Sequence, residues 1–210
     1  MQHEPCCNLF SSTMYKKLII TLFYPIFILL SCKVLIEKRY GMNRPFRFET
    51  KNEYTNYLSG KGFPSSNMLV IDSSSIDAFA QALAQNQQTV YYGCFLNDTT
   101  ELKKTESVKE NLGCAGRILN DVSLNINKVH YDSSLLIKSN FNEFVFRKLI
   151  DDSKFNMNES EKQLKIIMVY SYSLGSYYDS MYTDIIHFYK ENIRSTDLYI
   201  ISLDPVNRLQ

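Results

Sequence analysis

The sequence predicts an α/β domain in which a mainly parallel sheet carries helices on both faces. From residue 67 onward, strand patterns alternate with helix patterns, and helices of that length between strands act as crossover connections. Two almost uninterrupted apolar runs, at 165–172 and 198–203, are typical of parallel strands that are buried on both faces. The chain has 210 residues, which is close to the usual size of one domain.

The composition argues against several classes of protein. Because 45% of the residues are hydrophobic and 13% are aromatic, the chain does not resemble a disordered protein. A formal net charge of +1 argues against a nucleic-acid partner. Three histidines and five cysteines leave little for a metal cluster, and we predict no metal and no cofactor.

The N-terminal segment has the pattern of a membrane address. Lys16 and Lys17 precede an uncharged apolar run at 18–31, which would reach ~21 Å as a helix against ~30 Å for the hydrocarbon core of a bilayer. The run therefore fits the hydrophobic region of a signal peptide better than a membrane span. It ends in Leu-Leu-Ser before Cys32, which resembles a bacterial lipobox, so Cys32 is the expected lipidation site.

The alternative to a lipid anchor is an uncleaved signal anchor, extended past Lys33 by the apolar residues 34–36. Either anchor predicts a protein of the cell envelope that is attached to the membrane and faces the periplasm or the exterior. In that compartment Cys94 and Cys114 either form a disulfide or remain buried thiols. The predicted organisation is upstream residues and a signal peptide at 1–31, a tether with an irregular lead-in at 32–66, and a single α/β domain at 67–210.

The first part of the predicted domain contains strands and helices in alternation. Residues 68–72 form a short apolar run. Apolar residues then recur at helical spacing over 75–86, and this predicts an amphipathic helix. Residues 89–96 are β-branched and aromatic, as in a strand. An acidic capping pattern follows and predicts a helix over 99–112.

The second part repeats the alternation. Residues alternate in polarity around 122–131, which predicts a strand, and a second capping pattern predicts a helix over 141–151. The polar stretch 152–164 reads as a loop. The two apolar runs are the last strands, and the helix predicted over 177–191 lies between them.

The stretch that most strongly suggests chemistry is Ser-Tyr-Ser-Leu-Gly at 171–175. A serine between a strand and a helix is the context of the nucleophile elbow, Gly-x-Ser-x-Gly. Here Ser171 replaces the first glycine, Ser173 occupies the nucleophile position and Gly175 is the second glycine. A serine at such a junction is also a common helix N-cap, so a purely structural role for Ser173 stays open.

Together with its flanks, this stretch resembles the alpha/beta-hydrolase family over about residues 89–206. Residues 90–95 resemble the strand that ends in the family's oxyanion loop, and residues 129–132 resemble the next strand. Residues 198–205 resemble the strand after the elbow helix, where an apolar run ending in Asp-Pro is common. The order of strands and helices is also the family's order.

The resemblance implies a serine-hydrolase site with Ser173 as nucleophile and Asp204 as the acid. The backbone N–H of Leu174 and the loop at Cys94 and Phe95 would supply the oxyanion donors. The family's histidine comes later in the chain, whereas this sequence stops six residues after Asp204. Without that base the serine is not activated, so the resemblance implies a degenerate or truncated hydrolase, esterase-like if active at all.

Two other interpretations compete with the hydrolase. Ser173 and Ser176 stand where a thioredoxin-like domain carries Cys-x-x-Cys, and with serine at both positions such a domain has no thiol–disulfide exchange. In the hydrolase interpretation His187 is not expected to be the missing base, because it lies within the helix predicted over 177–191, where a packed or surface role is expected. The third interpretation is a non-catalytic envelope protein that binds a partner. Separately, an incomplete parallel sheet would leave an exposed edge, which predicts poor solubility or a protein partner for the isolated chain.

Overall fold

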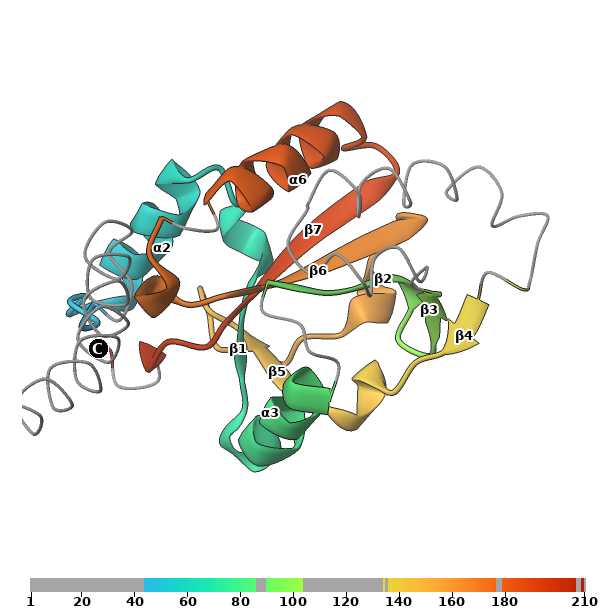
Figure 1. Cartoon of the computed structure of the whole chain (residues 1–210), viewed down its shortest axis with the longest axis horizontal. Coiled ribbons are helices and arrows are strands. Elements are labelled where there is room, and N and C mark those ends of the chain that lie inside the picture. Colours follow the sequence, from blue (N-terminus) through green and yellow to red (C-terminus); the bar gives the residue numbers. More distant parts are fainter. Residues whose placement is uncertain are drawn as a thin grey trace, which may run out of the picture.

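The computed structural model describes residues 44–85, 90–103, 134, 136–176, 179–206 and 209. Seven strands in this part of the chain form one sheet in the order β4-β3-β2-β6-β7-β1-β5 (Figure 1). The strands are β1 (Met68–Ile71), β2 (Tyr91–Asn97), β3 (Thr100–Leu102), β4 (Leu136–Lys138), β5 (Phe146–Lys148), β6 (Leu164–Tyr170) and β7 (Thr196–Ser202). The predicted α/β class is confirmed.

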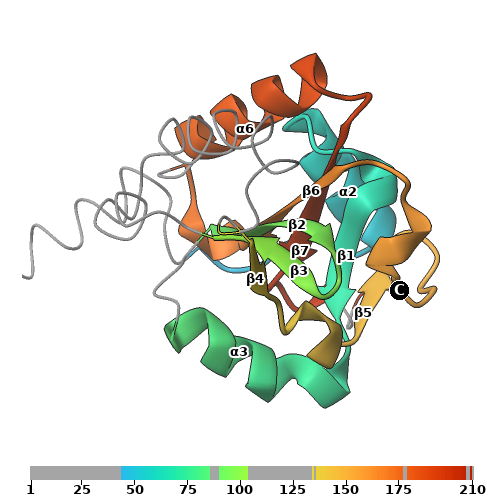
Figure 2. The same ribbon diagram turned by 90° about the vertical axis from the view of Figure 1, so that its right-hand side faces the viewer.

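Helices cover both faces of the sheet, as the sequence predicted. The α-helices are α2 (Lys51–Gly60), α3 (Ile76–Gln85) and α6 (Asp179–Glu191). Helices α2 and α6 lie on one face and α3 lies on the other (Figure 2). Short 3-10 turns are η1 (Ser65–Asn67), η2 (Ser73–Ser75), η4 (Phe141–Glu143), η5 (Met157–Glu159) and η6 (Tyr172–Leu174).

The described strands form a mixed sheet and not the mainly parallel sheet that the sequence predicted. Strands β6, β7 and β1 run parallel to one another. Strand β2 lies antiparallel to β6, β5 lies antiparallel to β1, and β3 and β4 continue the antiparallel side. A buried apolar run has the same pattern in either direction, so the sequence did not reveal that β2 runs opposite to β6. The parallel centre therefore has an antiparallel strand on each side, where an open edge was expected.

Each face of the sheet carries its own apolar layer. Tyr54 and Leu58 of α2 and Ile185 of α6 are buried against one face. Phe79 of α3 and Phe146 of β5 are buried against the other. Every residue of β6 and of β7 is buried, as expected for central strands that are covered on both sides.

Helix α2 lies in the stretch where the sequence predicted an irregular lead-in. Thr50 caps it by accepting the Glu53 backbone N–H, and the Glu53 carboxylate accepts the N–H of Glu49. Its buried side chains include Tyr54 and Leu58, one turn apart. The rest of the helix is polar, so its apolar stripe is too narrow to produce a clear periodic signal.

Two predicted helices are wrong where the structure describes them. Residues 100–102, the start of the helix predicted over 99–112, are strand β3, because the Asn97 side chain accepts Thr99 N–H and closes a tight hairpin turn after β2. The helix predicted over 141–151 is the single turn η4 followed by β5. There the phenylalanines at 141, 144 and 146 all enter the core, which an extended chain permits and one helical face does not.

Other elements agree with the sequence. The helices over 75–86 and 177–191 and the strands over 89–96, 165–172 and 198–203 are confirmed as α3, α6, β2, β6 and β7. The signal segment, Cys32, Cys114 and the strand predicted around 122–131 lie outside the described residues. Within the described part of the chain, no helix has the length and apolar character needed to cross a bilayer.

Candidate functional site

The ends of β6 and β7 bring the two predicted catalytic residues into one neighbourhood. Tyr170 is the partner of Ser202 where these parallel strands end, and Leu203 N–H donates to Tyr170 O at 2.8 Å. The chain then turns through η6 after β6, which places Ser173 beside the segment that contains Asp204. In α/β sheets this carboxyl edge is where ligands usually bind.

The Asp204 carboxylate is the centre of a hydrogen-bond network. It accepts the Tyr54 hydroxyl at 2.6 Å, the Ser171 hydroxyl at 3.0 Å and the Tyr172 backbone N–H at 2.8 and 2.9 Å to its two oxygens. Tyr54 also lies 2.8 Å from the Ser202 hydroxyl. The carboxylate thus joins α2, β7 and the turn after β6 through groups of the chain itself.

Burial is the largest influence on the pKa values of Asp204 and Tyr54. It raises the pKa of Asp204 above its ordinary value, although the donors from Tyr54, Tyr172 and Ser171 and the charge of Arg44 oppose the rise. Burial and the nearby carboxylate also raise the pKa of the Tyr54 hydroxyl far above its ordinary value. Tyr54 therefore remains a donor to Asp204.

Ser173 is connected to Asp204 only through Ser171. The two serine hydroxyl oxygens are 2.8 Å apart. Ser171 has one hydroxyl proton and donates it to Asp204, so the Ser173 hydroxyl is the donor in the serine pair. Ser171 also accepts the Ser173 backbone N–H at 3.3 Å and caps the η6 turn. The helix-cap role considered for Ser173 belongs to Ser171.

The turn itself has a reason for its glycine. Gly175 has a φ of +66°, a conformation that side chains disfavour. The backbone N–H of Leu174, a predicted oxyanion donor, donates instead to Ser171 O at 3.1 Å within η6. In this conformation that N–H is used inside the turn.

The structure does not bring Cys94 and Phe95 to Ser173. Because β2 is antiparallel to β6, Cys94 is the partner of Ile166 and Phe95 the partner of Lys165. Ile166 lies four residues before the end of β6, or ~13 Å along the strand. Both predicted oxyanion residues are buried in the sheet, 0% exposed, toward the opposite edge.

Gly93, next to Cys94, has a packing reason for being glycine. A Cβ at this position would lie 2.5 Å from Glu101 Oε1 and 2.9 Å from the ring of Phe95. The small residue that resembled part of an oxyanion loop is therefore needed for close approach within the sheet.

No imidazole joins the network among the described residues. Their one histidine, His187, is exposed on α6 and forms no hydrogen bond with Ser173. This part of the chain also contains no group of three or more side chains suited to hold a metal ion.

Two residues from the segment predicted as a tether, Arg44 and Tyr57, also contact the end of β6 and the turn after it. The Arg44 guanidinium donates to Tyr172 O at 2.7 Å and to the Tyr57 hydroxyl at 3.1 Å, and it lies 3.6 Å from the centre of the Tyr172 ring. Tyr57 in turn lies 3.0 Å from the Tyr170 hydroxyl. No local motif marks Arg44, Tyr54 or Tyr57, since each acts through contacts more than 100 residues away in sequence.

An apolar hollow of about 350 Å³ opens beside Asp204. It lies between α3 and the segments that follow β1 and β7. Its lining is Val70, Ile71, Ile76, Phe79, Ala80, Leu83, Ser202, Leu203, Asp204, Pro205 and Val206. A mostly apolar surface with a few polar groups is the usual character of a binding site.

Comparison of the chain with protein-family models, with curated proteins and with solved structures finds no significant match.

Proposed function

We propose that the chain is a membrane-anchored envelope protein whose α/β domain binds a partner and does not catalyse a reaction. The observation that carries this proposal is the direction of the hydrogen bonds around Ser173. Its hydroxyl proton goes to Ser171, and the acceptor oxygens of Asp204 already serve Tyr54, Ser171 and Tyr172. A serine becomes a nucleophile only when a base takes its proton, and a neighbouring serine is not such a base.

The apolar hollow beside Asp204 supports the binding part of the proposal. It is flanked by Ile76 and Leu203, which remain 43% and 45% exposed. Apolar side chains exposed together beside a concave surface are typical of an interaction site. A protein partner would cover them.

An ester-hydrolysis assay tests the catalytic part. With p-nitrophenyl acetate and the full chain, we expect the same background rate for the wild type, for Ser173→Ala and for the control Ser176→Ala. A wild-type rate that is at least tenfold higher and is lost only in Ser173→Ala would contradict the proposal and favour a serine hydrolase.

The degenerate-hydrolase interpretation has less support than the sequence suggested. A hydrolase needs its oxyanion donors beside the nucleophile. Cys94 and Phe95 lie toward the other edge of the sheet, and Leu174 N–H is used within the turn. The proximity of Ser173 and Asp204 is the feature in its favour.

A redox-inactive thioredoxin-like domain is the second candidate. Strands β6 and β7 are parallel and are joined through α6, and this βαβ unit is the setting of a thioredoxin-type Cys-x-x-Cys motif. Ser173 and Ser176 precede α6 in that unit and are separated by two residues, which is the spacing of Cys-x-x-Cys.

Restoring the two cysteines tests this second candidate. If it is right, Ser173→Cys/Ser176→Cys forms an intramolecular disulfide and reduces insulin in the presence of dithiothreitol. Ser171→Cys/Ser176→Cys is the matched control, with the same number of new thiols at a different spacing. Equal behaviour of the two variants would exclude a thioredoxin-type site.

The proposed anchor has its own test. A lipid on Cys32, or alternatively an uncleaved signal anchor, would hold the domain at the membrane. Metabolic palmitate labelling should be lost in Cys32→Ala and kept in Cys6→Ala, and labelling that persists in Cys32→Ala would reject the lipid anchor.

A further inference from the structure

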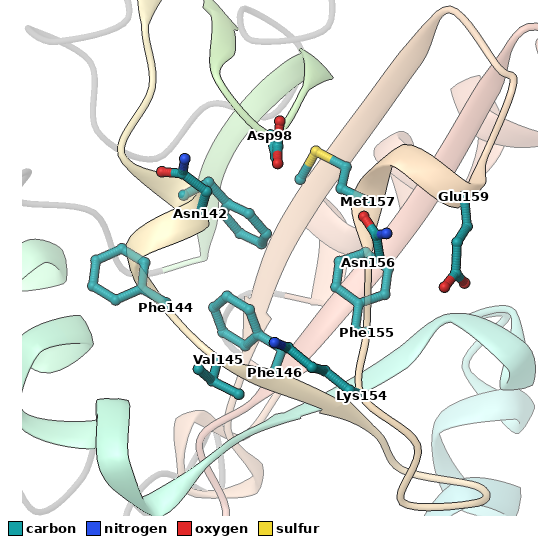
Figure 3. A pocket seen from close by; sticks show the side chains of 11 residues that line it. Asp98, Asn142, Phe144, Val145, Phe146, Lys154, Phe155, Asn156, Met157 and Glu159 are labelled. Carbon is teal, nitrogen blue, oxygen red and sulfur yellow. The ribbon is translucent and has the colours of Figure 1, made fainter.

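Figure 3 shows a second hollow, which has a volume of about 390 Å³. It opens between β5, η4, the turn after β2 and the segment that leads into η5. It shares no residue with the hollow beside Asp204. Its lining is Asp98, Phe141, Asn142, Phe144, Val145, Phe146, Lys154, Phe155, Asn156, Met157 and Glu159.

The floor of this hollow is apolar and held by the core. Phe141, Phe146 and Met157 are 2–3% exposed, and Phe155 is 8% exposed. The rings of Phe141 and Phe146 stack with their centres 4.8 Å apart, and Phe155 lies 4.8 Å from Tyr199 of β7. Such a surface takes apolar groups of a ligand without rearranging.

Two opposite charges stand at the rim. Asp98 belongs to the turn after β2 and Lys154 follows β5, and Figure 3 shows them on opposite sides of the hollow with Phe146 and Phe155 between them. Within the part of the chain that the structure describes, neither the Asp98 carboxylate nor the Lys154 ammonium has a hydrogen-bond or ion-pair partner.

Neighbouring charges are paired, which distinguishes them from these two. Glu159, the third charged residue of the rim, lies 3.7 Å from the Lys148 ammonium. Arg147 of β5 lies 2.7 Å from Asp72. Among the described residues that line the hollow, Asp98 and Lys154 are therefore the charges that remain available to a ligand.

We propose that this hollow binds a short peptide with apolar side chains, its terminal ammonium toward Asp98 and its terminal carboxylate toward Lys154. A free amino acid carries both charges on one carbon, whereas each added residue separates the termini by up to ~3.5 Å. A peptide therefore matches two separated charges with an apolar surface between them. The side-chain amide of Asn142, on the same rim, is placed to hydrogen-bond the peptide backbone.

Titration calorimetry with the full chain and the tripeptide Phe-Ala-Phe tests this proposal. The N-acetylated and the C-amidated tripeptides each lack one terminal charge, and we expect each to bind about 2- to 5-fold more weakly, the usual effect of one exposed charge pair. Free phenylalanine should bind more weakly than any of the three.

Two variants assign each charge to its partner. In Asp98→Asn, N-acetylation should no longer weaken binding while C-amidation still does, and in Lys154→Gln the dependence should be reversed. Glu161→Gln and Lys190→Gln are matched controls, since both side chains are exposed and lie outside the hollow. These variants alter only surface charges, so folding is not at risk.

Two results would overturn the proposal. One is the absence of detectable binding of the tripeptide at millimolar concentration. The other is a capping penalty that is unchanged in Asp98→Asn and Lys154→Gln. Because the readout is binding at a separate hollow, either result leaves the proposal about Ser173 standing.

Discussion

Two carboxylates of this chain have opposite surroundings. Asp204, half-buried between α2 and the end of β6, is bound by Tyr54, Ser171 and Tyr172. Asp98, at the rim of the other hollow, donates its backbone N–H to Asn158, but its carboxylate has no hydrogen-bond or ion-pair partner among the described residues. A carboxylate that accepts hydrogen bonds from three segments of its own chain holds those segments together, whereas an unpaired charge at the surface can still recognise a ligand.

Helix α2 supplies Tyr54 to the Asp204 network, so the network forms only if α2 is packed against the sheet. Leu58→Ala removes a side chain that is 0% exposed, and we expect a loss of ~2–5 kcal/mol in the free energy of unfolding. Asn56→Ala, at an exposed position of the same helix, is the control and should change stability by less than ~0.5 kcal/mol. Urea denaturation of the full chain measures both, and equal values would place α2 outside the cooperative fold.

The network itself gives the next largest effect. Tyr54→Phe keeps the ring but removes the hydroxyl that bonds Asp204 and Ser202, which should lower the free energy of unfolding by ~1–3 kcal/mol. Asp98→Asn should change stability by less than ~0.5 kcal/mol. If the two substitutions cost the same in urea denaturation, the difference between the two carboxylates is not real.

Much of this arrangement follows from the sequence, and the part that does not has a physical cause. The apolar runs of β6 and β7 predicted two buried parallel neighbours, and parallel neighbours end at the same edge, so Ser173 and Asp204 do lie close together. Burial patterns contain no information about strand direction, so Cys94 and Phe95 were expected at the wrong edge.

Other residues of the two sites could not be identified from local sequence patterns. Tyr54 and Arg44 contact the network from a polar segment, through pairings more than 100 residues apart that no local pattern encodes. The Asp98 turn was interpreted as a helix start, because an acidic residue with Glu101 three positions later fits a capping box as well as a hairpin turn.

A smaller effect is expected in the pH dependence of stability. Because the pKa of Asp204 is raised in the folded state, the folded protein binds this proton more tightly than the unfolded chain between the ordinary pKa and the raised one. The free energy of unfolding therefore falls as pH rises through that window. Asparagine does not bind this proton. The free energy of unfolding of Asp204→Asn should therefore rise relative to that of the wild type as pH rises from the ordinary pKa to the raised one.

Asp72 is the contrasting case for the same measurement. The hydrogen bond from Arg147 lowers the pKa of Asp72 to about 2. The ionised Asp72 therefore stabilises the folded state above its ordinary pKa, and this stabilisation is lost as pH falls toward 2. Asp72→Asn should therefore lose stability relative to the wild type above pH 4 and approach it at lower pH. Denaturation series from pH 2 to 8 measure both variants, with exposed Asp184→Asn as control; matching trends for Asp72→Asn and Asp204→Asn would contradict the two opposite environments.

The reactivity of Ser173 toward a fluorophosphonate tests the central claim most directly. The folded full chain is incubated with the reagent between pH 6 and 9, and adducts are located by mass spectrometry of the digested protein. We predict no adduct on Ser173 at any pH, because its proton is donated to Ser171 and no base receives it. A Ser173 adduct that forms in the folded chain and disappears in the urea-unfolded chain would show an activated nucleophile and contradict the account.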